Sequence, residues 1–229
     1  MASKMSNYVV RTSRGPVYFH AEERSPRVML IHGFKRSPRQ VAAWRQRIPG
    51  LGLIALPGHG DAPELDEVSI ESWVAAWREA LTDLGGSRVL IGESLGAIVA
   101  MCLPARAVVA VDPLLGVEHI WPQRAAMRNA RARGMEIGAA YEALFDSSYD
   151  WVLDRISAPT LVIAGQTPLL PPRPLGPFAP SLLTDEDFDR YAAHPLVEAR
   201  RIPGGHTLLD ENPDGVMQLV APFLAAHGD

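Results

Sequence analysis

The stretch GESLG at residues 92–96 places a serine between two glycines, directly after an apolar run typical of a buried strand. The apolar run AIVAMCL follows it as a helix that Pro104 ends. A strand, G-x-S-x-G and a helix in this order lift the serine hydroxyl above the edge of a sheet. Gly92 and Gly96 let neighbouring backbone approach a strained serine. We predict that Ser94 is a nucleophile, with a structural turn serine as the alternative.

A serine hydroxyl is a weak nucleophile until a base removes its proton, so a histidine must lie within reach. Among seven histidines, His206 stands on the loop between the last strand pattern and the last helix. Asp112 ends the apolar run AVVAV, which follows the nucleophile's strand along the chain. A carboxylate must in turn orient the histidine, and Asp112 is the first candidate for this acid. Asp185, Asp187 and Asp189 are the reserve candidates, although they look more like the acidic first turn of a helix.

Short apolar runs indicate the elements that must position these side chains. RVMLIHG, GLIALPGHG, SRVLIGESLG, RAVVAVDPL and APTLVIAG are typical of strands buried on both faces of a parallel sheet. Before them, YVVRT and VYFHA flank a turn at residues 13–16 and predict an N-terminal hairpin.

Helical periodicity appears between and after these runs. Apolar residues at helical spacing predict a helix over 70–84, with Ser69 as its N-cap and Gly85 at its C-terminal stop. A last helix begins at Pro213, with Asn212 as its cap. Strands that alternate with helices predict the α/β class, a mostly parallel, doubly wound sheet with helices on both faces. Ligands bind such sheets at the carboxyl ends of the strands, where the candidate residues lie.

Four motifs together resemble those of the α/β-hydrolase superfamily, in the family's order and over nearly the whole chain. They are HGF at 32–34, LPGHG at 56–60, GESLG at 92–96 and GGH at 204–206. The resemblance implies an α/β-hydrolase fold, Ser94 as nucleophile and His206 as base. It also implies an oxyanion hole made by the amides of Phe34 and Leu95. His32 and His59 would then have structural roles.

The sequence departs from the family pattern at the acid. Most small members carry an Asp after the strand that corresponds to PTLVIAG, whereas this chain reads GQTPLLPP. Thr167 and Pro168 occupy the expected positions, and neither can hold an imidazole by charge. Some members carry the acid on the preceding strand, so the resemblance points to Asp112, in the order Ser, Asp, His.

Residues 115–155 are too many for a simple connection and predict a small helical cap inserted into a single domain over 1–229. Arg124, Arg128 and Arg131 fall on one helical face, which would favour an anionic substrate if it faced the pocket and is otherwise a solvated outer face. The residues of this segment that we expect to contact substrate are His119, Trp121, Tyr141 and Phe145.

Composition excludes several classes of protein. The formal net charge of −4 argues against nucleic acid or an anionic membrane as partner. The single cysteine, Cys102, allows no intrachain disulfide and reads as a buried small hydrophobe. No apolar segment resembles a signal peptide or a membrane span, so we expect a soluble cytoplasmic protein. No metal-ligand spacing or glycine-rich phosphate loop appears, and we expect neither metal nor organic cofactor.

Three functions fit these residues. The first is a serine hydrolase that cleaves a small carboxylic ester or thioester through an acyl-enzyme on Ser94. The second is a cofactor-independent dioxygenase or lyase of the same fold, in which His206 and Asp112 act as a base dyad. The third is a binding protein on a hydrolase scaffold. In each the partner is a small molecule.

Overall fold

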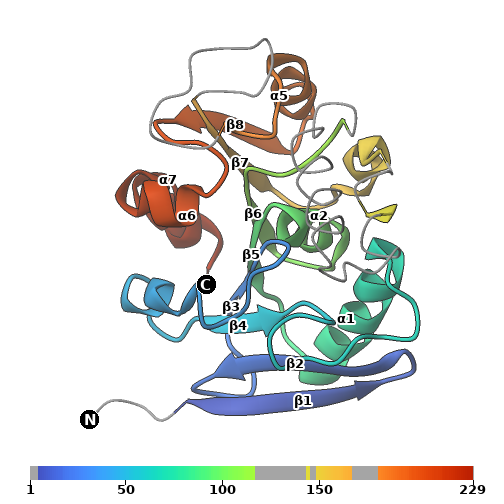
Figure 1. Cartoon of the computed structure of the whole chain (residues 1–229). Helices are drawn as coiled ribbons and strands as arrows, with labels where there is room; N and C mark the ends of the chain where they lie inside the picture. Colours follow the sequence, from blue (N-terminus) through green and yellow to red (C-terminus); the bar gives the residue numbers. More distant parts are fainter. Residues whose placement is uncertain (1–4, 117–142, 145–147, 167–179, 229) are drawn as a thin grey trace, which may run out of the picture.

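The computed structural model describes residues 5–116, 143–144, 148–166 and 180–228. Its centre is an eight-stranded sheet in the order β1-β2-β4-β3-β5-β6-β7-β8 (Figure 1). The strands are β1 Ser6–Thr12, β2 Gly15–Ala21, β3 Val28–Ile31, β4 Gly52–Ala55, β5 Val89–Glu93, β6 Ala107–Val111, β7 Thr160–Gly165 and β8 Val197–Ile202. From β4 to β8 all neighbours pair in parallel, and β2 joins this part antiparallel to β4. The predicted mostly parallel, doubly wound sheet is confirmed.

The N-terminal hairpin is confirmed, with a shorter turn than predicted. β1 and β2 pair antiparallel, and Thr12 already pairs with Gly15. Because of this pairing Gly15 belongs to the second strand, and only Ser13 and Arg14 form the turn. Gly15 adopts φ of 120° there. The glycine's access to positive φ lets the second strand begin two residues earlier than the sequence pattern indicates.

Helices cover both faces of the sheet (Figure 1). On one face lie α1 Ile70–Leu84, α2 Leu95–Cys102, η3 Asp150–Arg155 and α5 Asp185–Ala192. On the other lie η1 Ala42–Gln46, α6 Leu208–Glu211 and α7 Pro213–His227. None of the helices in the described ranges is both long and apolar enough to cross a membrane.

The predicted helix caps are present. Ser69 Oγ accepts a hydrogen bond of 3.1 Å from Ser72 N at the start of α1, and Gly85 ends that helix at φ of 62°. Asn212 Oδ1 accepts a bond of 2.9 Å from Gly215 N at the start of α7. These side chains satisfy N–H groups that the first turn of a helix leaves without intrahelical partners.

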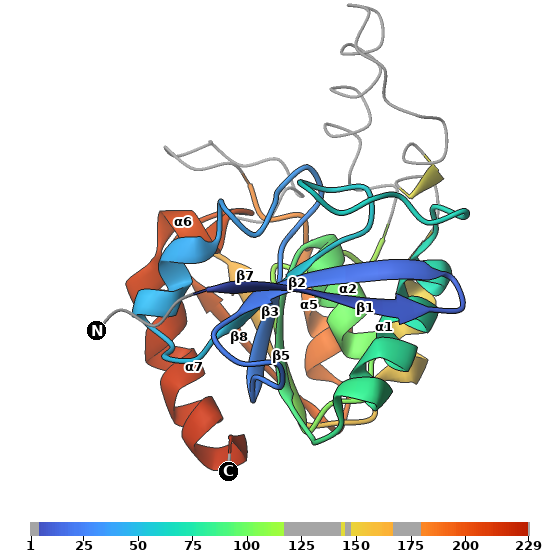
Figure 2. The same ribbon diagram turned by 90° about the horizontal axis from the view of Figure 1, so that it is seen from below.

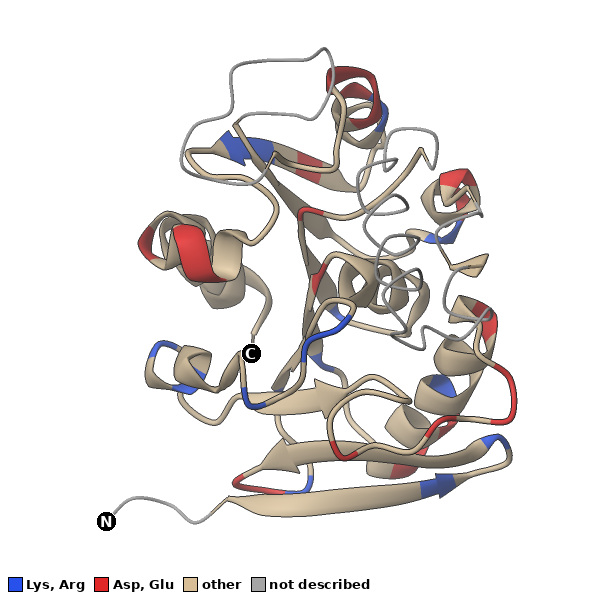
Figure 3. Ribbon diagram, viewed as in Figure 1, with Lys and Arg blue, Asp and Glu red and all other residues tan. Residues whose placement is uncertain are grey.

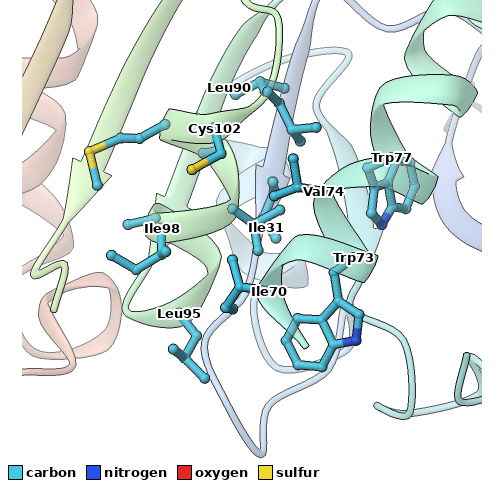
Figure 4. Packing of buried hydrophobic residues seen from close by; sticks show 14 of the residues in the cluster. Ile31, Ile70, Trp73, Val74, Trp77, Leu90, Leu95, Ile98 and Cys102 are labelled. Atoms are coloured by element: carbon cyan, nitrogen blue, oxygen red, sulfur yellow. The ribbon is translucent and has the colours of Figure 1, made fainter. Parts of the chain in front are cut away.

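The core between α1, α2 and the sheet is built from large apolar side chains (Figure 4). Trp73 and Trp77 of α1 are fully buried, as the periodicity predicts. All residues of α2 are buried, including Cys102, so this helix is enclosed by protein. Burial of α2 fixes the position of its first turn, which carries the candidate nucleophile.

The predicted cap at about 115–155 falls mostly outside the described residues, and its fold stays a prediction. Its two described ends lie close together, because Tyr149 N donates a hydrogen bond of 3.0 Å to Leu115 O. Leu144 and Tyr149 pack in the same core cluster as α1 and α2. These residues therefore attach the inserted segment to the body of the protein.

Candidate active site

Ser94 lies in the sharp turn between β5 and α2, as predicted. It adopts φ of 55° and ψ of −122°, and its N–H donates a hydrogen bond of 3.0 Å to Val111 O of the neighbouring strand. The turn requires its glycines. A Cβ on Gly92 would lie 2.3 Å from Gly96 O, and a Cβ on Gly96 would lie 2.4 Å from Ile31 O. The backbone contacts of the turn therefore explain why the serine stands between glycines.

Asp112 and His206 form a direct pair. The distance between His206 Nδ1 and Asp112 Oδ2 is 2.6 Å, although 94 residues separate the two in sequence. Asp112 follows β6 directly and is fully buried. Val111 pairs with Glu93, so Asp112 and Ser94 leave neighbouring strands at the same edge of the sheet. The sheet therefore gathers all three predicted residues at its carboxyl edge.

Three further donors hold the Asp112 carboxylate. Its Oδ1 accepts hydrogen bonds from Gly165 N at 3.1 Å and from Ser181 Oγ at 2.5 Å. Its Oδ2 also accepts one from Leu182 N at 3.0 Å. A buried carboxylate is costly unless donors satisfy it, and here it has four partners with His206 included. Sequence reasoning missed Ser181, because nothing in its neighbourhood pairs it with Asp112.

The reserve acids lie elsewhere. Asp185, Asp187 and Asp189 belong to α5, where they form the acidic side of a short helix that Thr184 caps through Asp187 N at 3.0 Å. Asp185 is 3.1 Å from an Arg201 guanidinium nitrogen. The Nδ1 hydrogen bond of the candidate base goes to Asp112 and to none of the three.

The loop that carries His206 packs directly on β7. A Cβ on Gly165 would lie 2.6 Å from Gly205 O, so only a glycine admits the loop at this distance. Glu211 holds the loop from the other side, with Gly205 N at 2.6 Å from its Oε2 and Thr207 Oγ1 at 2.6 Å from its Oε1. Both neighbours of His206 are thereby fixed, and the imidazole direction with them.

The surroundings of His206 raise its pKa above the ordinary value of 6.5. Burial by itself lowers the pKa. The hydrogen bond to Asp112, the charge of Asp112, and the charges of Glu93 and Glu211 outweigh it. Together they favour the imidazolium, the form that a general base becomes when it takes a proton.

The loop after β3 lies against the nucleophile. A Cβ on Gly33 would be 3.2 Å from Ser94 Cβ, so the backbone before Phe34 contacts the serine turn. Leu95 is the first residue of α2, and its N–H therefore has no intrahelical acceptor. The positions of both predicted oxyanion donors beside Ser94 are consistent with that role, which stays a prediction. Ser94 Oγ itself forms no hydrogen bond with a residue in the described ranges.

His32 is a neutral structural residue in this loop. Leu56 N donates to His32 Nε2 at 3.2 Å, so Nε2 is the acceptor and Nδ1 carries the proton toward Gly33 O at 2.8 Å. Burial lowers the pKa of His32 to about 4. His59 contacts the rings of Phe34 and Trp73 edge-on. These contacts are consistent with the structural roles that the resemblance implies for both histidines.

Lys35 and Arg36 read in the sequence as a solvated basic loop, but the structure places Arg36 in the candidate site. Only 12% of the Arg36 side chain is exposed. Its Nη1 lies 2.8 Å from Oε1 of the buried Glu93, and its Nη2 lies 2.8 Å from Asp210 Oδ2. In Figure 3 the blue loop after β3 reaches the red carboxyl end of β5. A charged residue, Glu93, inside an otherwise apolar strand pattern was the available signal.

The four residues predicted to contact substrate, His119, Trp121, Tyr141 and Phe145, lie outside the described residues, as do Arg124, Arg128 and Arg131. Within the part of the chain that the structure describes, no group of three or more His, Cys, Asp or Glu side chains is arranged to hold a metal ion. The described part of the site therefore consists of Ser94, His206, Asp112 and the loop at 32–36.

The family model described as the alpha/beta hydrolase family matches residues 28–219 of this chain. The chain belongs to the alpha/beta hydrolase family. The match includes the serine turn, Asp112 and His206. A comparison with curated proteins gives no match.

Solved structures with this fold include several enzymes. An esterase of Pyrococcus furiosus superposes with a TM-score of 0.73 at 14% identity, over 100% of this chain and 92% of the other. The naproxen esterase of Bacillus subtilis gives a TM-score of 0.71 at 16% identity, over 97% and 92%. The E-2-(acetamidomethylene)succinate hydrolase gives a TM-score of 0.74 at 14% identity, over 97% and 100%. At these identities the likeness establishes the fold of this hydrolase-family chain.

Proposed function

We propose that this protein is a serine hydrolase that cleaves a small carboxylic ester or thioester through an acyl-enzyme on Ser94. The observation that carries the proposal is the 2.6 Å pair of Asp112 and His206 at the same sheet edge as Ser94. The strained backbone of Ser94 agrees with it, because such conformations cluster at functional sites. Structural neighbours that are described as esterases and as a thioesterase domain give further support.

The reaction begins with proton transfer. His206 Nε2 takes the Ser94 Oγ proton while the oxygen attacks the carbonyl carbon of the ester. The carbonyl oxygen becomes an oxyanion, which the Phe34 and Leu95 amides stabilise. The imidazolium then protonates the leaving alkoxide or thiolate as its bond to carbon breaks. His206 then takes a proton from water as the water oxygen attacks the acyl carbon. The bond from that carbon to Ser94 Oγ breaks, and the imidazolium returns its proton to Oγ as the acid leaves.

Asp112 holds the imidazole in the form that this cycle needs. Its carboxylate accepts a hydrogen bond from the Nδ1–H of His206, so Nε2 is left as an acceptor for the serine proton. The four partners of Asp112 fix its position. We expect Asp112→Asn to lower kcat by roughly 10³ to 10⁴ without unfolding the protein, because the amide stabilises the wrong tautomer.

Labelling with a fluorophosphonate probe tests the proposal. Attack by Ser94 Oγ on phosphorus expels fluoride and leaves a covalent adduct that intact-protein mass spectrometry detects. We expect one adduct on the wild type and none on Ser94→Ala. Hydrolysis of p-nitrophenyl acetate and of an acyl thioester, in the wild type and in Asp112→Asn, then distinguishes the two substrate classes.

The same experiment separates the alternatives. If the wild type is not labelled, Ser94 is not an activated nucleophile and the proposal fails. Oxygen uptake or lyase activity that requires His206 and Asp112 but survives Ser94→Ala would then identify a base dyad. Tight ligand binding without any turnover would identify a binding protein.

A further inference from the structure

Three arginines form a row across the amino ends of three neighbouring strands. Arg27, Arg88 and Arg106 directly precede β3, β5 and β6. Val28 pairs with Val89, and Val89 pairs with Ala107, so the arginines occupy equivalent positions on adjacent strands. Backbone bonds of 3.0 Å from Val89 N to Arg27 O and of 2.7 Å from Arg106 N to Arg88 O continue the ladder through this row. Since paired strands lie about 4.8 Å apart, the three arginines stand close together.

A surface hollow of about 320 Å³ lies at this row. Its lining contains all three arginines and no Asp or Glu in the described ranges. The other lining residues are small or apolar: Ser25, Pro26, Gly85, Gly86, Ser87 and Gly228. Added Cβ atoms on Gly85 and Gly86 would meet nothing within 4 Å, so the rim beside the arginines is open. Three arginines therefore line the hollow, and no acidic residue lies in its described lining.

Arg88 is the residue that makes this hollow unusual. It is only 4% exposed, and none of its hydrogen bonds within the described residues is with a carboxylate. Its Nη1 donates to Gly86 O at 3.1 Å, and its Nη2 donates to Ser25 Oγ at 2.7 Å. Its Nε is buried with no hydrogen-bond partner among the described residues. A buried charge is normally paired, so this guanidinium lacks the anion that its burial calls for.

The neighbouring arginines also lack acidic partners in the part of the chain that the structure describes. Arg27 and Arg106 are exposed, and neither forms an ion pair with a residue of the described ranges. The adjacent Arg24 differs, because its Nη2 lies 3.0 Å from Asp83 Oδ2. Within the described residues, the arginine outside the hollow is thus paired with a carboxylate, whereas the arginines that line the hollow are not. The contrast is informative because acidic residues outnumber basic ones in this protein, whose formal net charge is −4.

We propose that this hollow binds a dianionic oxyanion, a phosphate ion or the phosphate group of a small phosphomonoester, between Arg27, Arg88 and Arg106. A planar guanidinium can donate two parallel hydrogen bonds to phosphate oxygens, and the arginines that line the hollow come from three neighbouring strands. The hollow exceeds a phosphate ion in size, so a small alcohol moiety also has room.

The proposed site is separate from the candidate active site. It lies at the amino ends of the parallel strands, whereas Ser94, Asp112 and His206 lie at the carboxyl ends. Figure 2 shows the C-terminal end of α7, which reaches the hollow through Gly228, on the side of the molecule opposite to the loop after β3. Ligand binding there does not depend on the proposed hydrolase chemistry.

Isothermal titration with inorganic phosphate and with glycerol 3-phosphate, against chloride at equal ionic strength, tests the site. We expect phosphate to bind with a stoichiometry of one and chloride to give no heat. Tighter binding of the ester indicates that a phosphomonoester is the ligand, and equal binding indicates free phosphate. Arg27→Gln and Arg106→Gln are surface changes that should each weaken binding roughly tenfold or more.

Three controls keep the test decisive. Arg24→Gln removes a nearby arginine that does not line the hollow and should leave the affinity unchanged. Ser94→Ala should also bind normally, which excludes the candidate active site as the origin of the heat. Asp229→Asn is titrated in parallel because a carboxylate follows Gly228 in the sequence. No phosphate binding in either the wild type or Asp229→Asn, or equal loss in Arg24→Gln and Arg106→Gln, overturns the proposal.

Discussion

Arg36 and Glu93 form a buried ion pair beside the candidate nucleophile, with 2.8 Å between Arg36 Nη1 and Glu93 Oε1. Glu93 is the residue before Ser94, and Arg36 belongs to the loop that would supply an oxyanion donor. The second Arg36 nitrogen reaches Asp210 on α6, shortly after His206. One guanidinium thus connects the nucleophile turn, the oxyanion loop and the histidine loop, which makes it a positioning residue.

We expect Arg36→Ala to lower both stability and activity. It leaves Glu93 buried and unpaired, which costs about 3 to 5 kcal/mol in comparable pairs. The double variant Arg36→Ala/Glu93→Gln removes that charge and should regain part of the free energy of unfolding, measured by urea denaturation. If the single and double variants unfold at the same urea concentration, the pair does not contribute as the geometry indicates.

Activity separates positioning from stability in the same variants. Because the oxyanion loop loses its anchor in both, kcat should stay well below wild type in the double variant while KM changes less. Asp210→Asn is the milder comparison, since 55% of the Asp210 side chain is exposed and its bond to Arg36 is partly screened. Wild-type kcat in the double variant would assign the network a purely structural role.

The activity should fall at acid pH with a midpoint above 6.5. The hydrogen bond and charge of Asp112 outweigh the effect of burial and raise the pKa of His206, and protonated His206 cannot act as base. In Asp112→Asn burial still lowers the pKa while the main opposing effects are gone, so the acid limb of kcat/KM should move to lower pH. The measurement is kcat/KM for a neutral ester over roughly pH 5–9. An unshifted limb would mean that Asp112 does not control the base.

Ser181→Ala should lower kcat/KM roughly tenfold or more, because the buried Asp112 carboxylate loses a hydrogen-bond donor at 2.5 Å. Ser148→Ala is the matched control. Its hydroxyl also donates to a carboxylate, that of Asp150, but on the exposed surface. Steady-state kinetics of both variants check the prediction, and equal effects would contradict it.

Gly96→Ala should abolish activity and destabilise the fold. Its Cβ would lie 2.4 Å from Ile31 O and 2.5 Å from His32 O, so β3 and the oxyanion loop must move. Gly50→Ala serves as the control, because it introduces a methyl at φ of 74° with nothing within 4 Å. We expect a loss of about 1 kcal/mol there from backbone strain alone, with normal kcat. Thermal unfolding and turnover of the two variants test this difference.

Local chemistry allowed much of the fold to be predicted from the sequence. Apolar runs such as VLIGE specify strands buried on both faces, and Ser69 and Asn212 specify helix starts, because each signal acts within a few residues. GESLG specifies the serine turn for the same reason, since its glycines are required by contacts inside the turn and with the adjacent strand. Ser94, His206 and Asp112 were therefore accessible as candidates.

The tertiary structure alone decided which distant residues meet. The sequence left Asp112 in competition with Asp185, Asp187 and Asp189, and only the parallel register of β6, β7 and β8 brings the Asp112 carboxylate to His206. Ser181 joins it from a separate segment that no local pattern connects to β6.

Ion pairs between residues far apart in the sequence could not be predicted from local patterns either. Arg36 reads as a solvated residue in the sequence because its partners, Glu93 and Asp210, are 57 and 174 residues away. The arginines before β3, β5 and β6 become a row only when the three strands pair in register. Periodicity and turn chemistry act locally and are written in the sequence, whereas burial, ion pairing and pKa depend on long-range packing.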